Sequence, residues 1–222
     1  MPIRKSVDVV QQLLDEMDAI VRNYHPEVGR TGRNVADLIQ GTAFFPGGCG
    51  LWRGREPWGP MQECFPEAAI MLVAHNFDSI ESHDRSKRRG GEVPSSFWLK
   101  KLLPILESAK IDPSDVFFTN ALMGCKPGSA MGAMPIVAGY EDQCIEFLKR
   151  QIEIVRPLVA VALGNQAHDR LRKVWPDAER IMHPSARELN PLDTRPEQIR
   201  EQAKRLAEIV SHARDMLSKQ PV

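Results

Sequence analysis

The sequence predicts an α/β protein with a central, mostly parallel four-stranded sheet and helices on both faces. Two observations lead to this prediction. Short apolar runs alternate with amphipathic stretches along residues 67–222, and this order is typical of parallel strands joined by helices. A length of 222 residues suits one domain with a sizeable core. We therefore expect a single domain over residues 1–222, with an N-terminal helix and Gly/Pro-rich loop segment (1–66) and an α/β core (67–222).

The N-terminal segment begins with a helix and continues as a loop-rich stretch. Apolar residues recur at steps of three and four, which favours an amphipathic helix over Ser6–Tyr24. From Gly29 to Pro66 the density of glycine and proline breaks regular structure. Disordered stretches are poor in aromatic residues, so we expect this one to be ordered, because it holds Phe44, Phe45, Trp52 and Trp58.

Four strands and four helices are predicted in the core. Apolar runs bounded by polar residues predict buried strands at residues 69–73, 116–119, 158–163 and 179–182. Helical spacing of apolar residues predicts helices at residues 97–109, 141–155 and 166–174. A capping box at residues 194–197 opens a last helix. Sites in such sheets form beyond the carboxyl ends of the strands, so the residues that follow each run are the candidates.

Composition and charge exclude several classes of protein. The chain has no apolar run of about 20 residues, the length that a membrane helix needs. Its N-terminus lacks the apolar core of a signal peptide, so we expect a cytoplasmic protein without a membrane partner. Lys plus Arg and Asp plus Glu both number 29. Because the net charge is zero, bulk charge does not attract the chain to polyanions, and any contact with nucleic acid must be local.

Polar residues suited to holding a nucleobase follow the predicted strands. Asn120 follows the second strand, and one Asn side chain accepts from an N–H and donates to a C=O of a base edge. His183 follows the fourth strand, where a donor would stabilise a departing base anion. We expect Asn120 and His183 to face one pocket at the carboxyl ends of neighbouring strands. Ordinary alternatives stay open: Asn120 caps a turn, His183 is a core histidine, and Asn76 and Asp78 are turn residues.

Four segments, correctly ordered and spaced, resemble those of the uracil-DNA glycosylase superfamily, and the layout is nearest to its iron-sulfur branch, family 4. The resemblance covers residues 69–191. DVFFTNALMGCK (115–126) is similar to the family's DVYITNVVKC, and FLKRQIEIVRPLVAVALGNQA (147–167) to its FLxxQIxxIxPxxIVALGxxA. HPSARELNP (183–191) is similar to HPSALLRNP, and IMLVAHNFD (70–78) lies where the family has an apolar strand and a motif such as GEAPG.

The resemblance implies a role for each matching residue. Asn120 matches the asparagine that reads the uracil edge, and His183 matches the histidine that stabilises the leaving base. Residues 187–189 match the loop that enters the minor groove and supports the flipped-out nucleotide with an apolar wedge. No metal is needed for this reaction, in which water captures an oxocarbenium-like sugar. The DNA-binding residues of this motif are Ser185, Arg187 and Leu189.

The first motif departs from the family. Relatives carry GEAPG, GQDPY or GINPG where this chain has AHNFD at residues 74–78. Asn76 lines up with the water-positioning residue of two branches. An amide orients water but does not take its proton, which predicts slower chemistry. His75 and Asp78 are further candidates for catalysis.

The aromatic face for the base also differs from family 4. Counting back from Asp115 puts Pro94 where that branch has its stacking phenylalanine. Phe77 is therefore a candidate for binding the base, and Phe97 and Trp98 are candidates for stacking on it. Ordinary helix packing of Phe97 and Trp98 stays open as the alternative.

Two cysteines resemble half of an iron-sulfur site. Cys125 and Cys144 match the second pair of family 4 ligands, but no CxxC pair precedes the first strand, and Cys49 and Cys64 lie in the Gly-rich segment. Cys144 shares the apolar face of its helix, which suits a buried thiol. We expect no cofactor, with a 4Fe-4S cluster on Cys49, Cys64, Cys125 and Cys144 as the alternative.

A basic cluster follows the first strand end. Arg85, Lys87, Arg88 and Arg89 are expected in a loop where backbone phosphates would approach, and Arg88 and Arg89 are the DNA-binding candidates. A solvated loop without a ligand is the alternative.

These observations lead to one expected function and two alternatives. We expect an enzyme of base excision repair, a DNA glycosylase that hydrolyses the N-glycosidic bond of uracil or a related deaminated base. A catalytically weak or inactive relative that binds nucleic acid or a nucleobase is the alternative, because the first motif is altered. A nucleotide-binding metabolic enzyme is disfavoured, since no GxGxxG or P-loop pattern follows a strand.

Overall fold

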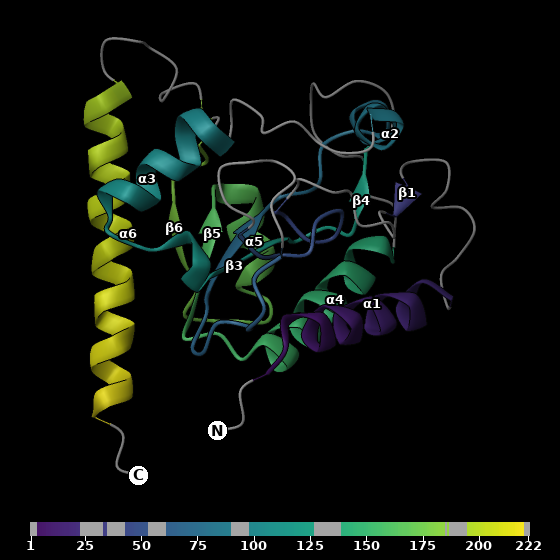
Figure 1. The fold of residues 1–222 in the computed structure, drawn as a ribbon, viewed down its shortest axis with the longest axis horizontal. Coiled ribbons are helices and arrows are strands. Elements are labelled where there is room, and N and C mark those ends of the chain that lie inside the picture. The colour runs from purple at the N-terminus through teal and green to yellow at the C-terminus, as the bar shows by residue number, and fades with distance from the viewer. Residues whose placement is uncertain are drawn as a thin grey trace.

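A computed structural model of the chain has the predicted α/β architecture (Figure 1). It describes residues 4–22, 33–34, 43–52, 61–89, 98–126, 139–184, 186 and 195–219. Four strands pair in parallel in the order β3-β2-β5-β6, so the predicted four-stranded parallel sheet is confirmed. The strands are β2 (Ile70–Ala74), β3 (Val116–Asn120), β5 (Val159–Leu163) and β6 (Glu179–Ile181).

The strands are apolar on both faces because both faces of the sheet are covered. Every residue of β2 is buried, and its side chains alternate between two separate hydrophobic clusters. Met71 and Val73 belong to one cluster, and Ile70 and Leu72 to the other. A sheet buried on both faces requires such continuous apolar strands, which is why the runs stand out in the sequence.

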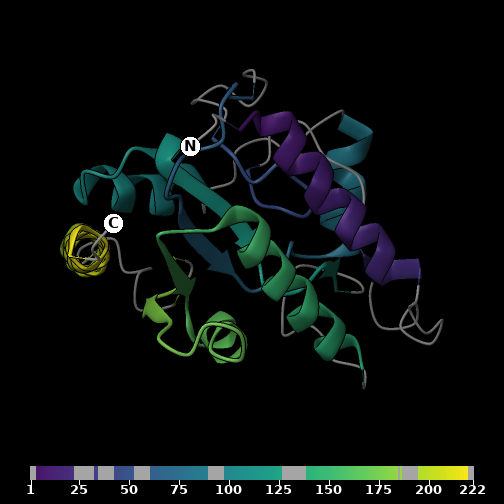
Figure 2. The same ribbon diagram turned by 90° about the horizontal axis from the view of Figure 1, so that it is seen from below.

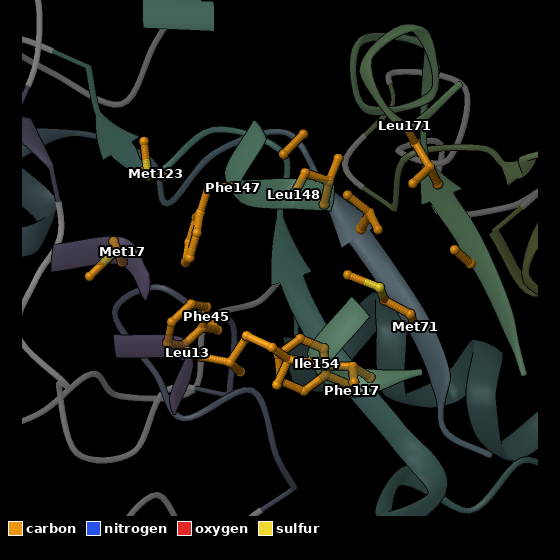
Figure 3. Packing of buried hydrophobic residues seen from close by; sticks show 14 of the residues in the cluster. Leu13, Met17, Phe45, Met71, Phe117, Met123, Phe147, Leu148, Ile154 and Leu171 are labelled. Atoms are coloured by element: carbon orange, nitrogen blue, oxygen red, sulfur yellow. The ribbon is translucent and has the colours of Figure 1, made fainter. Parts of the chain in front are cut away.

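Helices lie on both faces of the sheet, as predicted (Figure 2). On one face α1 (Ser6–Arg22) packs against α4 (Tyr140–Val155), and α5 (Asn165–Leu171) joins the same cluster. On the other face α3 (Leu103–Ser108) packs against α6 (Arg195–Ser218). In Figure 3 side chains of α1, α4, β2 and β3 converge in the first core: Leu13, Met17, Met71, Phe117, Phe147, Leu148 and Ile154.

The segment 43–52 lies along the outer side of β3. The Phe45 N–H donates to the Phe118 carbonyl at 2.9 Å, and the Asn120 N–H donates to the Phe45 carbonyl at 2.9 Å. The Phe45 ring enters the core beside Phe117 and Phe147 (Figure 3). This part of the Gly/Pro-rich stretch is therefore ordered against the sheet edge. Two further residues of the stretch form β1 (Arg33–Asn34), which pairs antiparallel with β4 (Gly124–Cys125).

One helix was not predicted. Residues Ile80–Arg89 form α2, whereas the basic cluster within it was expected in a loop. Ser79 accepts a hydrogen bond from the Ser82 N–H at 3.2 Å, Glu81 lies in the first turn, and basic residues fill the last turn. Capping and charges that oppose the helix dipole stabilise this helix without an apolar stripe, so periodicity did not reveal it.

The predicted helix at 97–109 is two pieces: a π-helical segment η2 (Trp98–Leu102) leads into α3. Between α3 and β3 lies a short 3-10 helix, η3 (Pro113–Asp115). The described part of the chain contains no helix with the length and apolar content to cross a membrane.

Candidate functional site

Four residues at the carboxyl ends of the strands form one row across the sheet. Asn120 pairs with Ala74, the last residue of β2. Because Val73 pairs with Ala162, the next residue Leu163 of β5 lies level with Ala74. Leu163 in turn pairs with Ile181 of β6, which completes the row. The residues that follow this row therefore meet at one edge of the sheet, where α/β proteins bind ligands.

The prediction that Asn120 and His183 lie at the ends of neighbouring strands is wrong. Asn120 ends β3 and His183 follows β6, which are the outer strands of the four-stranded order. The two strands themselves are three strand spacings apart, about 14 Å. The residues after β2 and β5, among them His75 and Gly164, occupy the interval. The two predicted residues thus lie at opposite ends of the carboxyl edge of the sheet, to which all four strands contribute.

Asn120 is held by the segment that lies beside β3. The residue is 3% exposed, and Nδ2 donates to the Phe45 carbonyl at 3.1 Å. One amide hydrogen is thereby committed within the protein. The other amide hydrogen and Oδ1 make up a donor and an acceptor on one side chain, which is the pair that a base edge with adjacent N–H and C=O groups requires.

His183 is positioned by close packing and by α6. Gly164 has a φ of +87°, and a Cβ at this position would lie 2.8 Å from the His183 Cβ. Glycine is required there both for the backbone conformation and for the approach. The Met182 N–H donates to Gln202 Oε1 of α6 at 2.7 Å, which fixes the turn before His183. Burial and, to a smaller degree, the charge of Lys101 lower the pKa of His183, which favours a neutral imidazole.

His75 lies between these two residues along the sheet edge and is neutral near pH 7. Burial, then the charges of Arg170 and His183, lower the pKa of His75 to about 4, and Glu141 opposes the shift. Both ring nitrogens are buried and have no hydrogen-bond partner among the described residues. A buried polar group without a partner costs free energy of folding. We therefore expect this imidazole to bind a ligand or a water.

An ion-pair network behind His75 was not predicted from the sequence. Arg170 of α5 lies 3.3 Å from a Glu141 oxygen, and Lys173 lies 2.7 Å from the other. The Arg170 side chain is only 12% exposed and also donates to the Gln166 carbonyl at 2.8 Å. Glu141 is 29 residues away from Arg170 in the chain, and no local pattern connects them. The network nevertheless acts on the pKa of His75, which the charge of Arg170 lowers and the charge of Glu141 raises.

Asn76 stabilises the turn after β2. Its Nδ2 donates to the Asp78 carbonyl at 2.7 Å. Asp78 has a φ of +96°, an unfavourable conformation for a residue other than glycine, and its carbonyl also accepts from the Lys126 N–H at 3.0 Å. The turn interpretation of Asn76 thus has a structural basis. Its Oδ1 is not part of that bond and is the atom that would accept a hydrogen bond from water.

The aromatic candidates are placed only in part. Phe77 is 9% exposed, packs beside Cys125 and Ile80, and meets the His83 ring edge-on at 5.9 Å between centroids. Its ring also lies against Gly47. This packing favours a structural role for Phe77. The side chain of Trp98 and all of Phe97 lie outside the described residues.

The DNA-binding candidates fall into two groups. Arg88 and Arg89 are exposed in the last turn of α2, together with Arg85 and Lys87 on the same helix. The loop candidates Ser185, Arg187 and Leu189 lie outside the described residues.

The four cysteines do not come together. Across the described residues, which include all four, no three side chains of His, Cys, Asp or Glu gather as a metal site. Burial raises the pKa of the Cys144 thiol to about 12, which suits its place in the hydrophobic core. Cys64 is exposed, and its backbone bridges to Lys5 at the start of α1. The cysteines as placed do not fit an iron-sulfur cluster.

The family model described as the uracil DNA glycosylase superfamily matches residues 84–207, which is more than half of the chain. The matched stretch includes Asn120, Gly164 and His183. A search of curated proteins found no matching relative.

Proposed function

The chain belongs to the uracil DNA glycosylase superfamily, and from this premise we propose that it removes uracil or a related deaminated base from DNA. In this proposal water hydrolyses the N-glycosidic bond and leaves an abasic sugar. The family 4 branch remains part of the proposal, because its segments resemble this chain most in layout.

The carrying observation is the position of Asn120 and His183 at one edge of the parallel sheet, with both residues inside the stretch that the family model matches. A nucleotide must leave the duplex to reach such an edge, as enzymes that act on bases require.

The proposed chemistry follows from the protonation states. Asn120 contributes Oδ1 to a base N–H and its second amide hydrogen to the adjacent carbonyl. The glycosidic bond breaks with its electron pair moving to the base nitrogen, so the base leaves as an anion. The neutral His183 imidazole carries one N–H, which donates to that anion. Water then bonds to the sugar carbon and loses a proton to solvent.

A second candidate function is binding of DNA or a nucleobase without cleavage. The observation that favours it is the engagement of Asn76, because its amide nitrogen is bonded to the Asp78 carbonyl. An amide also does not take a proton from water.

The test is excision from uracil-containing single- and double-stranded DNA, followed by alkaline cleavage of abasic sites and gel separation. We expect Asn120→Ala to weaken base recognition and His183→Ala to slow cleavage by roughly 100-fold. His212→Ala, at an exposed position of α6, is the control and should behave as the parent. Binding of the same DNA without cleavage by the parent supports the second candidate. Equal cleavage by the parent and both site variants refutes the assigned roles.

A further inference from the structure

Three donors surround one carbonyl oxygen next to the proposed base-reading residue. The Phe45 carbonyl lies 2.9 Å from the Asn120 backbone nitrogen and 3.1 Å from Asn120 Nδ2. The Thr119 hydroxyl oxygen lies 3.1 Å from the same carbonyl. A carbonyl oxygen has two lone pairs, so three hydrogen bonds exceed its ordinary capacity.

Gln151 of α4 offers the third donor another acceptor. The Thr119 hydroxyl lies 2.6 Å from Gln151 Oε1, a shorter contact than the 3.1 Å to Phe45. A hydroxyl has a single hydrogen, so bonding to Gln151 and bonding to the Phe45 carbonyl are alternatives. When the Thr119 hydroxyl donates to Gln151 Oε1, the two lone pairs of the Phe45 carbonyl oxygen accept from the backbone N–H and the Nδ2 of Asn120.

We propose that Gln151 is a positioning residue for Asn120: it takes the Thr119 hydroxyl and so reserves the Phe45 carbonyl for the Asn120 side chain. The inference rests on the proposed function, in which Asn120 reads the base. Gln151 does not contact the base and acts only through Thr119 and Phe45.

The hydrogen bond to the Phe45 carbonyl determines the orientation of the Asn120 amide. In the observed orientation Nδ2 donates to Phe45. Rotation of the amide by 180° would lose this bond and place Oδ1 about 3 Å from another acceptor, which is repulsive. The fixed orientation presents a constant donor and acceptor to the base. A Thr119 hydroxyl that competed for the carbonyl would weaken this preference.

Burial and packing make the arrangement specific to these residues. Thr119, Gln151 and Phe45 are each at most 1% exposed, so bulk water does not replace a lost partner. The Phe45 ring packs against Phe147 at 5.9 Å between centroids, and Phe147 precedes Gln151 by one turn on α4. The same helix face therefore holds the Phe45 ring and draws the hydroxyl away from its carbonyl.

The experiment is a double-mutant cycle on Gln151 and Thr119, read by uracil excision. Gln151→Leu removes the alternative acceptor, and we expect kcat/KM to fall about five- to tenfold, as for one ordinary hydrogen bond. Thr119→Val removes the competing hydroxyl and should stay within about twofold of the parent. The double variant should recover to the same level, because no hydroxyl competes any longer. A double variant as slow as Gln151→Leu, or a Gln151→Leu variant as fast as the parent, overturns the proposal.

A second readout is independent of activity and of the proposed function. In protein labelled with ¹⁵N-asparagine, the Asn120 side-chain amide signal is assigned by its loss in Asn120→Ala. We expect its hydrogens to exchange with solvent at least fivefold faster in Gln151→Leu than in the parent, and at the parent rate in the double variant. Unchanged exchange in Gln151→Leu overturns the positioning role. A parent that lacks excision refutes the glycosylase function alone, since the exchange measurement still decides the role of Gln151.

Discussion

Asn76 illustrates how one side chain in the altered motif serves the turn and the site together. Its Nδ2 holds the carbonyl of Asp78, whose positive φ needs support, while Oδ1 remains for water. His75 next to it is neutral near pH 7 because burial and Arg170 lower its pKa to about 4. Neither residue changes its charge near neutrality.

The first prediction concerns the residue that holds the attacking water. We expect Asn76→Ala to slow single-turnover cleavage of uracil-DNA more than His75→Ala or Asp78→Ala. The parent rate should depend little on pH between about 6 and 8, because an amide does not titrate and the pKa of His75 lies below this range. Thermal melting of each variant checks that the turn after β2 is intact.

One result would contradict this assignment directly. If Asp78→Ala abolishes cleavage while Asn76→Ala keeps nearly all of it, the Asp78 carboxylate is the base. The alignment of residues 74–78 with the family motif would then be wrong by two residues.

At the scale of single residues, the sequence identified groups that follow strands and missed groups that act across the chain. Asn120 and His183 were found by type and position after an apolar run, and the structure places both at one sheet edge. Arg170 had no such signal, and Gln151 was only one matching position of the segment 147–167, with no role assigned to it. Gln151 reaches Thr119 across 32 positions, and Arg170 reaches Glu141 across 29. Only the packing of helices against the sheet brings these pairs together.

At the scale of elements, α2 gathers the basic residues of the sequence cluster on one exposed helix. Arg85, Lys87, Arg88 and Arg89 are exposed on one short helix that follows the carboxyl end of β2. The C-terminal turn of a helix favours basic residues, so the sequence of α2 stabilises the helix and concentrates positive charge on it.

The second prediction tests this surface. Replacing both Arg88 and Arg89 by Gln should weaken DNA binding and reduce the salt dependence, since each lost phosphate contact lowers the slope of log K against log salt by about 0.9 for duplex DNA. The double variant should therefore lose up to about 1.8 in slope. The matched control is Lys204→Gln with Arg214→Gln, two exposed basic residues of α6. An equal change in both double variants would mean that α2 is not a specific DNA contact.

Element boundaries were predictable where burial set them. The four strands agree with the apolar runs to within one or two residues, because a sheet covered on both faces selects for them. Periodicity failed for α2, whose residues are nearly all polar. It also gave one helix over residues 97–109 where the backbone forms two pieces, since sequence spacing does not distinguish a π-helical turn from an α-helix.

At the scale of the whole molecule, the cysteines are distributed over separate parts of the fold. Cys49 lies beside β3, Cys125 in β4 and Cys144 in α4, whereas Cys64 is exposed near the start of α1. The third prediction is that protein purified without oxygen carries no stoichiometric iron, measured by metal analysis and visible absorption. A brown preparation bleached by Cys125→Ser would contradict both this expectation and the packing role of Cys144.

The stability of the whole molecule depends on the protonation of His75. His75 belongs to a buried edge near α4 and α5, and the Arg170 and Glu141 side chains of those helices contact each other. In the folded state the pKa of His75 is about 4, whereas an unfolded chain has a His pKa of about 6.5. Between these values the unfolded chain binds more protons than the folded one, so stability must fall as pH falls through this range.

The fourth prediction is the size and origin of that loss. Between pH 7.5 and 4.5 the parent should lose up to about 2.5 kcal/mol more unfolding free energy than His75→Gln, which keeps polar atoms but does not titrate in this range. The measurement is urea unfolding at both pH values. His212→Gln, at an exposed position of α6, should lose as much as the parent. The comparison cancels carboxylates such as Glu141, whose lowered pKa costs stability in acid equally in all three proteins. If His75→Gln loses as much as the parent, the pKa of His75 in the folded protein lies near that of the unfolded chain, and the parent rate would then depend on its titration.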